Sequence, residues 1–263
     1  MVAVLEKEIA QIMKKDMNLA VLIDGDNIPS KYIKEMMEEI AKYGVPSIKR
    51  IYGDWTNPKL NRWKGLLLEH AIQPVQQYGY TTGKNSTDSA MIIDAMDILY
   101  SGNTDGFCIV SSDSDFTRLA TRLRESSQFV IGIGEQKTPK PFIVACDKFI
   151  YLEILHEDEE EGTPKVKQSV KQQKKAVEKV TPEIIKLIKT TVYDCADDVG
   201  WAFLGDVGGL INKKQPNFDP RNFGFYKLTP FIDSIGIFEI EERETSNGRF
   251  KHIYVRNKQK VNN

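Results

Sequence analysis

Up to about residue 150, the chain alternates short apolar runs with longer stretches in which apolar residues recur every three or four positions. Short apolar runs are typical of buried strands, whereas the three-to-four spacing is typical of one helical face. The predicted strands are Leu19–Ile23, Ser47–Tyr52, Ile72–Gln76, Phe107–Val110 and Phe129–Ile133. The predicted helices are Tyr32–Tyr43, Asn61–Ala71, Ser89–Tyr100 and Phe116–Arg124. This alternation predicts an α/β domain with a mostly parallel sheet covered on both faces.

A second apolar pattern begins near Thr181. Thr181 and Pro182 are typical of the N-cap and the first position of a helix, and apolar residues then recur on one helical face. Further on, a Ser-Asn-Gly sequence at 246–248 separates two β-prone segments, 235–242 and 250–256, which predicts a β-hairpin. Helices followed by a hairpin predict a small winged-helix domain of the α+β type.

The length and composition agree with two folded domains. A chain of 263 residues can bury two hydrophobic cores, and 41% apolar with 28% charged residues is ordinary for a globular protein. Between the two patterns the chain is rich in Glu, Lys and Gln and has no core pattern, which predicts a linker. The predicted segments are an N-terminal extension 1–16, an α/β domain 17–154, a charged linker 155–179, a winged-helix domain 180–257 and a tail 258–263.

No part of the sequence is predicted to enter a membrane. The apolar runs are far shorter than the roughly 20 residues that a spanning helix needs. The N-terminus has acidic residues between its apolar pairs, unlike a secretory signal. We therefore expect a cytoplasmic protein without a membrane partner.

Cysteine and histidine offer little material for chemistry. Cys108, Cys146 and Cys195 are scattered in apolar contexts, which predicts reduced core thiols and neither a disulfide framework nor a zinc site. The three histidines are dispersed, so a His-rich metal site or a serine-type triad is not expected. The net charge of -1 adds no information. Any catalytic chemistry must therefore come from carboxylates.

Aspartates lie where predicted strands end. Asp24 ends the first strand, and Asp113 follows the strand that ends at Val110 and opens a helix. Asp88 lies near the N-terminus of a helix between these two strands. Because ligands collect at the carboxyl ends of parallel strands, the three carboxylates can converge there if the strands are neighbours. Asp26 or Asp115 would then lie nearby.

Converging carboxylates require a counter-charge. Ionised carboxylates held within a few ångströms repel one another and would otherwise take up protons. A cluster rich in oxygen and poor in thiols suits Mg²⁺ or Mn²⁺. Such ions lower the pKa of bound water and stabilise charge on attacking and leaving oxygens. The pattern therefore favours phosphodiester hydrolysis.

Each of these acids taken alone could instead cap a helix. Three placements at the ends of elements in one sheet favour a shared site over three separate caps. Asp94 is six residues from Asp88, which places it on a different helical face. Residues that could orient a carboxylate or contact substrate are Asp26, Asn27, Lys84 and Asp94.

The segment from about 17 to 153 resembles the NYN family, the ribonuclease-like domains related to PIN nucleases. The stretches that carry the resemblance are 22–27, 84–88, 93–95 and 111–116. The resemblance implies a PIN-like three-layer α/β/α fold and an RNA nuclease that depends on Mg²⁺ or Mn²⁺. It places Asp24, Asp88, Asp113 and Asp115 at the matching acidic positions, as metal ligands and catalytic residues.

The second half resembles a LOTUS or OST-HTH domain through stretches 201–208 and 216–225. Such domains are associated with RNA binding, so the resemblance implies a single-stranded or structured RNA partner. A winged helix could instead contact duplex DNA through its recognition helix. Basic residues that could contact phosphates are Lys213, Lys214, Arg221 and Lys227. The aromatic residues expected in the core of this domain are Phe218, Phe223, Phe225 and Tyr226.

Two alternatives remain open at the level of sequence. The chain could be a catalytically inactive module that binds RNA or a protein partner. It could also be a haloacid-dehalogenase-like phosphatase, a class that uses an Asp-x-Asp sequence at the end of its first strand. Asp26 is followed by Asn27 and Ile28 where that class usually has Thr or Val, which makes the phosphatase a poorer fit.

Overall fold

The computed structural model describes residues 16–78, 86–155, 178–244 and 251–258. The chain divides into two compact units, 1–134 and 135–263, and each is described by itself. Several sequence predictions lie outside the described residues. These are the N-terminal extension up to residue 15, Lys84, the linker at 156–177 and the hairpin turn at 246–248.

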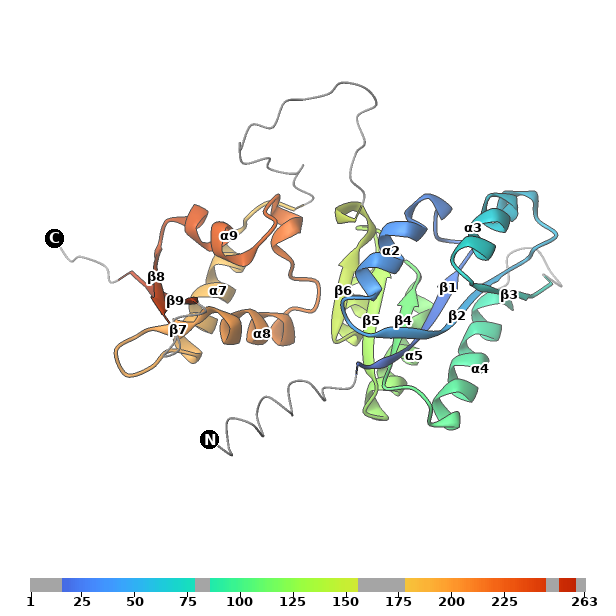
Figure 1. The fold of residues 1–263 in the computed structure, drawn as a ribbon, viewed down its shortest axis with the longest axis horizontal. Helices are drawn as coiled ribbons and strands as arrows, with labels where there is room; N and C mark the ends of the chain where they lie inside the picture. Colours follow the sequence, from blue (N-terminus) through green and yellow to red (C-terminus); the bar gives the residue numbers. More distant parts are fainter. Residues whose placement is uncertain (1–15, 79–85, 156–177, 245–250, 259–263) are drawn as a thin grey trace, which may run out of the picture. The chain divides into compact units, whose positions relative to one another are not determined.

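A six-stranded sheet forms the centre of the α/β fold (Figure 1). Its strands are β1 (Asn18–Asp24), β2 (Val45–Gly53), β3 (Gln73–Gln76), β4 (Gly106–Val110), β5 (Phe129–Gly134) and β6 (Lys148–Tyr151). Their order is β3-β2-β1-β4-β5-β6. Four of the pairings are parallel: β1 with β2, β1 with β4, β2 with β3, and β4 with β5. The prediction of a mostly parallel sheet is confirmed.

Helices connect the strands and cover the sheet (Figure 1). They are η1 (Ser30–Tyr32), α2 (Ile33–Ile40), η2 (Pro58–Trp63), α3 (Lys64–Glu69), α4 (Ser86–Ser101), η3 (Ser114–Phe116), α5 (Thr117–Glu125), α6 (Lys140–Ala145) and η4 (Leu152–Ile154). Crossovers between parallel strands are right-handed, so α2 and α3 lie on one face of the sheet and α4 and α5 on the other. This is the three-layer arrangement that the sequence predicts.

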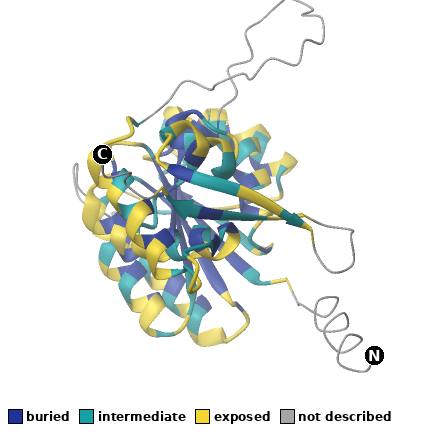
Figure 2. Ribbon diagram, turned by 90° about the vertical axis from the view of Figure 1, so that its left-hand side faces the viewer, coloured by how far each residue is buried: buried dark blue, intermediate teal, exposed yellow. Residues whose placement is uncertain are grey.

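The central position of β1 explains its sequence. It lies between β2 and β4, so its backbone is paired on both sides, and residues 19–24 are all buried. A strand covered on both faces is expected to be a continuous apolar run rather than an alternating one. Figure 2 shows exposed residues on the outer helical surfaces and buried residues toward the interior.

Helix α4 is buried on one face only. Met91, Ala95 and Ile98 are buried, but Ile93 is 63% exposed and Tyr100 is 74% exposed. The reason is that only one face of α4 packs on β1 and β2, although its sequence is apolar on several faces. None of the described helices combines the length and apolarity needed to span a bilayer.

The sequence prediction misses two short elements, α6 and β6. With six residues α6 covers less than two helical turns, and β6 has only four residues, so neither gives a long periodic signal. Phe142 of α6 and Phe149 of β6 are fully buried and meet edge to face, with ring centroids 5.9 Å apart. The Phe149 N–H also donates to the Pro216 carbonyl at 2.9 Å, a contact distant in sequence that local periodicity does not reveal.

The C-terminal domain combines helices with a small sheet, as the sequence predicts, although the sequence does not predict the third strand of the sheet, β7. Its elements are α7 (Pro182–Asp194), β7 (Ala202–Phe203), α8 (Leu204–Lys214), η5 (Pro220–Phe223), α9 (Leu228–Ile235), β8 (Phe238–Glu244) and β9 (Lys251–Asn257). The strand order is β7-β9-β8, and both pairings are antiparallel. Thr181 caps α7 by accepting a hydrogen bond from the Ile184 N–H. Core side chains come from every helix and from the hairpin.

Most of the predicted core aromatics of this domain are in its core. Phe218 and Phe223 are buried, and Phe225 packs against the same cluster. The prediction that Tyr226 lies in the core is wrong, because this residue is 54% exposed. It lies just before α9, where the chain returns to the surface.

All three cysteines are reduced thiols. Cys108 lies midway along β4 and is fully buried, and Cys146 is buried after α6. Cys195 at the end of α7 is half-buried. The prediction of core thiols is therefore confirmed for the first two.

Within the second unit, the side chain of Tyr151 at the end of β6 is hydrogen-bonded to Asn217 and to Glu178 in the segment before α7. The Tyr151 hydroxyl accepts a hydrogen bond from Asn217 Nδ2 at 3.0 Å and is hydrogen-bonded to the carboxylate of Glu178. Burial raises the pKa of Tyr151 to about 12. Burial also raises the pKa of Glu178, and the bond with Tyr151 opposes that shift. Burial therefore makes the ionised form of Glu178 less favourable in the folded chain.

Candidate metal centre

The end of β1 brings Asp24 to the carboxyl edge of the sheet. Ile23 pairs with Val110 of β4, so Asp24 and Ser111 follow as neighbours. Gly25 then donates its N–H to the Tyr52 carbonyl at 2.9 Å. A Cβ at Gly25 would lie only 2.9 Å from that carbonyl oxygen, so the chain can leave the sheet here only with glycine.

Asp24 is 1% exposed, and its two carboxylate oxygens differ in their hydrogen bonding. Its Oδ2 accepts hydrogen bonds from Asn27 Nδ2 at 2.6 Å and from Ser111 Oγ at 2.8 Å. Its Oδ1 is also buried but has no hydrogen-bond partner among the described residues. Burial raises the pKa of Asp24, although the bonds from Asn27 and Ser111 oppose the shift. The unpartnered oxygen is therefore available to a cation.

Three other aspartates meet beside it. Carboxylate oxygens of Asp88, Asp113 and Asp115 all lie within 4.8 Å of one another. Asp88 is in the first turn of α4, Asp113 is the N-cap of η3, and Asp115 is within η3. Asp113 Oδ1 accepts the Asp115 N–H at 2.9 Å, and Ser111 Oγ accepts the Asp113 N–H at 3.1 Å. Asp113 therefore caps η3 and belongs to the acidic group at the same time.

The carboxylate of Asp88 is the one most strongly repelled by the other acids of the group. Asp88 is 9% exposed, and its carboxylate faces the negative charges of the other acids. Burial first, and then the charges of Asp24 and the neighbouring aspartates, raise the pKa of Asp88 to about 6. A cation placed among these oxygens would offset both effects.

The predicted neighbours of the site take different positions. Asn27 is hydrogen-bonded to Asp24, and exposed Asp26 accepts a hydrogen bond from Thr87 Oγ1 at 3.1 Å. Thr87 precedes Asp88, so this bond joins the turn after β1 to the start of α4. Lys84 lies outside the described residues.

Asp94 lies apart from the cluster, on the part of α4 that packs on β2. It accepts hydrogen bonds from Arg50 Nη1 and from the Tyr52 hydroxyl. Arg50 and Asp94 are partly buried, at 30% and 22% exposure of their side chains. The carboxylate of Asp94 raises the pKa of Arg50 and contributes with burial to the raised pKa of Tyr52. Its negative charge is thus matched by a protein cation.

Sequence reasoning missed Ser111, Thr87 and Arg50 as supporting residues. Ser111 follows β4 as Asp24 ends β1, so the pairing of the two strands is the signal that could have found it. Thr87 adjoins Asp88 and offers a hydroxyl at a helix start. Arg50 gives no such signal, because its partner is fixed only by how α4 packs on β2.

The donor set fits a hard divalent cation. The cluster offers only carboxylate oxygens, with no histidine or thiol among the grouped ligands. Mg²⁺ and Mn²⁺ prefer such oxygen ligands. The buried, unpartnered Oδ1 of Asp24 is the kind of atom that a cation satisfies. The four acids of the predicted site are therefore neighbours, with three forming the tight group.

The basic residues predicted to contact RNA fall into two classes. Lys214 is ion-paired with Asp194 at 2.6 Å, and Arg221 is held by Asp219 through its Nη2 at 2.8 Å. Lys213 and Lys227 are exposed. Lys213 and Lys227, which have no ion pair among the described residues, are therefore better placed to contact a phosphate.

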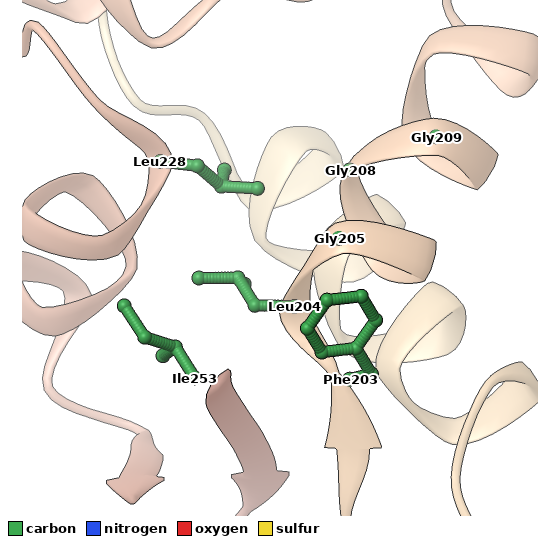
Figure 3. A pocket seen from close by; sticks show the side chains of 7 residues that line it. All are labelled: Phe203, Leu204, Gly205, Gly208, Gly209, Leu228 and Ile253. Carbon is green, nitrogen blue, oxygen red and sulfur yellow. The ribbon is translucent and has the colours of Figure 1, made fainter. Parts of the chain in front are cut away.

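An open apolar hollow of about 350 Å³ lies on the C-terminal domain (Figure 3). The residues that line it are Phe203, Leu204, Gly205, Gly208, Gly209, Leu228 and Ile253. None of them carries a charge. The side chains that line the hollow are therefore apolar.

Comparison with known proteins gives two domain matches. The model of the NYN domain matches residues 18–153, and the model of the OST-HTH/LOTUS domain matches residues 175–250. No curated protein matches the sequence.

Two solved structures are similar to part of the chain. One is the crystal structure of a protein of unknown function from Vibrio parahaemolyticus, with 18% identity and a TM-score of 0.43; the match covers 52% of this chain and 93% of that one. The other is the solution structure of an uncharacterized protein from Nitrosomonas europaea, with 29% identity and a TM-score of 0.29; the match covers 39% of this chain and 93% of that one.

Proposed function

The chain belongs to the NYN domain family, and from that membership we propose that residues 17–154 are a divalent-metal-dependent ribonuclease. The domain at 180–257 holds the RNA. The observation that carries the proposal is the group of Asp88, Asp113 and Asp115, whose carboxylate oxygens lie within 4.8 Å of one another. Asp24 adds a fourth carboxylate at the same edge of the sheet.

The residues of the centre have distinct tasks in this proposal. Asp88, Asp113 and Asp115 hold Mg²⁺ or Mn²⁺, and Asp24 completes the negative pocket. When bound, such an ion acts as a Lewis acid and lowers the pKa of a bound water. Ser111 and Asn27 fix Asp24 through its Oδ2, and the Asp115 N–H fixes Asp113. The carboxylates are thus oriented before RNA arrives.

The C-terminal domain supports the proposal through its class, since LOTUS domains are associated with RNA binding. Lys213 and Lys227 are exposed lysines that can contact phosphates. Such contacts do not depend on base sequence and weaken as salt rises. The two domains therefore divide binding and hydrolysis between them.

Cleavage of single-stranded RNA in Mn²⁺ tests the proposal. We expect the wild-type chain to cleave, and Asp24→Asn and Asp113→Asn to lose activity while their circular dichroism spectra stay unchanged. Asp97→Asn is the matched control, because Asp97 is an exposed aspartate on α4. It should retain full activity.

Three results would contradict the proposal in different ways. RNA binding without cleavage would make the chain a binding module. Release of phosphate from small monoesters, without RNA cleavage, would indicate the phosphatase class. Cleavage that survives in Asp113→Asn would place the chemistry elsewhere.

A further inference from the structure

Two aromatic residues follow the ends of β2 and β3. Trp55 comes two residues after β2, and Tyr78 comes two residues after β3. The order β3-β2-β1-β4 and the parallel pairing put these ends at the same edge of the sheet as the acids that follow β1 and β4. Along this edge the chain therefore presents two aromatic rings and then the acidic group.

Trp55 is held in a fixed orientation. Its indole Nε1–H donates to the Val75 carbonyl at 3.0 Å, and its backbone N–H donates to Gln76 Oε1 at 2.9 Å. Gln76 Nε2 in turn donates to Asp54 Oδ1 at 3.0 Å. The ring is half-buried. Because its orientation is set by hydrogen bonds, a ligand stacking on it would order no further side chain.

Tyr78 presents more of its ring to solvent and is 58% exposed. The residue before it, Gln77, donates its backbone N–H to the Gly53 carbonyl at 3.2 Å. This bond ties the segment after β3 to the end of β2. Tyr78 and Trp55 therefore emerge from adjacent, connected strand ends.

The end of β2 borders the acidic group directly. A Cβ at Gly53 would lie 3.6 Å from Asp26 Oδ1, and Asp26 accepts a hydrogen bond from Thr87 beside Asp88. Neighbouring strands are about 4.8 Å apart, so β2 and β3 lie roughly one and two such steps from β1. One or two nucleotides of an extended strand can span that distance.

We propose that Trp55 and Tyr78 form a base-stacking track, defined as these two residues, that receives unpaired bases of single-stranded RNA next to the phosphate at the acidic group. The inference rests on the proposed ribonuclease function and deepens it by naming the substrate class. Aromatic rings stack on any base, so the track accepts RNA without reading its sequence. A duplex keeps its base faces stacked and cannot use it.

Abasic scanning tests the track with the full-length chain. Short fluorescein-labelled single-stranded RNAs, each with one abasic position, are titrated in Ca²⁺, and binding is read by fluorescence anisotropy. We expect the wild-type chain to lose affinity by about tenfold at one or two adjacent positions. Elsewhere an abasic position should have little effect. Because no substitution is needed, the result does not depend on how a variant folds.

Variants then connect those positions to the two rings. Trp55→Leu and Tyr78→Leu should weaken intact RNA by about tenfold each and abolish the penalty of the matching abasic position. Trp55→Phe and Tyr78→Phe keep a ring and should keep most of the affinity. Tyr100→Leu is the matched control, because Tyr100 is an exposed aromatic at the other end of α4 from Asp88. Its affinity should equal that of the wild type.

Two outcomes would overturn the track. One is an abasic scan without any sensitive position in the wild-type chain. The other is a leucine variant that binds weakly but keeps the full abasic penalty, which would mean a structural effect. Cleavage in Mn²⁺ is measured separately. A wild-type chain that binds with the expected abasic pattern but does not cleave would contradict the ribonuclease proposal and leave the track supported.

Discussion

At the scale of single residues, Asp88 is held where its charge is unfavourable. Its carboxylate is buried near four other aspartates, and burial together with their negative charges raises its pKa to about 6. Near neutral pH the folded chain must ionise it at a cost, and a bound cation removes that cost. The same residue therefore lowers stability without metal and raises it with metal.

Asp88→Asn should reverse the response of stability to metal. In EDTA we expect the variant to be more stable than the wild type by about 1–2 kcal/mol, because the repulsion is gone. In Mn²⁺ the wild type should gain stability and the variant should gain little. Urea unfolding in both buffers measures this, with Asp97→Asn as a control that behaves as wild type. Equal metal stabilisation of Asp88→Asn and wild type would refute it.

Glu178 should make stability depend on pH. Its pKa is raised in the folded chain by burial, so the folded state binds its proton more tightly than the unfolded state does. Stability is therefore lost as pH rises through the range between the unfolded and folded pKa values, and the loss persists at neutral pH.

Glu178→Gln keeps the side-chain shape and removes that loss. The variant should be more stable than the wild type at pH 7, and the difference should vanish at acidic pH, where the carboxyl is protonated in both states. Urea unfolding at the two pH values decides this. A wild type that is the more stable chain at pH 7 would show that the ionised carboxylate is favourable.

The sequence identifies the acids of the centre but not their partners. Asp24, Asp88 and Asp113 can be predicted because their positions at element ends follow from periodicity. Ser111 acts through a hydrogen bond to Asp24 and Thr87 through one to Asp26, and these two hydroxyl side chains carry no pattern of their own. The distinction between the tight group and the buried Asp24 also depends on three-dimensional packing.

At the scale of elements, one residue of α4, Asp94, joins this helix to β2 through two hydrogen bonds. Asp94 of α4 is bonded to Arg50 and Tyr52 of β2, and Asp88 lies in the first turn of the same helix. A shift of α4 along β2 would therefore move Asp88 away from Asp113 and Asp115. The contact positions the centre without belonging to it.

Asp94→Asn should lower both stability and activity. Loss of the charge leaves Arg50 without its carboxylate, which we expect to cost about 1–3 kcal/mol in unfolding free energy. The rate of RNA cleavage should fall while the wild-type dependence on RNA concentration is retained, because the effect reaches the metal ligands and not the RNA surface. Asp97→Asn, also on α4, should leave both measurements unchanged. If the two variants behave alike, the contact has no positioning role.

Strands and long helices are predictable here, whereas short elements are not. The strands β1, β4 and β5 have enough consecutive apolar residues to be found, and the parallel pairing follows from alternation with helices. β6 has four residues and α6 has six, less than two full helical turns. Their residues are buried by partners far away in sequence, which a local window cannot detect.

At the scale of the whole molecule, RNA affinity should depend on salt through the C-terminal domain. Lys213 and Lys227 are exposed and have no ion pair among the described residues, whereas Lys214, which is also exposed, and Arg221 are paired with carboxylates. A lysine that already has a carboxylate partner gains less from a phosphate, because the first partner must be given up.

Replacing both exposed lysines should weaken RNA binding and its salt dependence. For Lys213→Ala combined with Lys227→Ala, the slope of log affinity against log salt should become shallower by about 1.4, or roughly 0.7 for each phosphate contact to a single strand. Lys214→Ala should change the slope less. Anisotropy titrations across a salt series measure it. An unchanged slope in the double variant would exclude these lysines as phosphate contacts.

The rate at which the buried thiol of Cys108 is modified should report how often the strands of the sheet separate. The thiol lies inside β4, between β1 and β5, so an alkylating reagent can reach it only when these strands separate. In a native chain, mass spectrometry should find Cys195 modified first and Cys108 much later, and Mn²⁺ should delay Cys108 further. Equal labelling rates for both thiols would show that the sheet opens far more readily than its packing indicates.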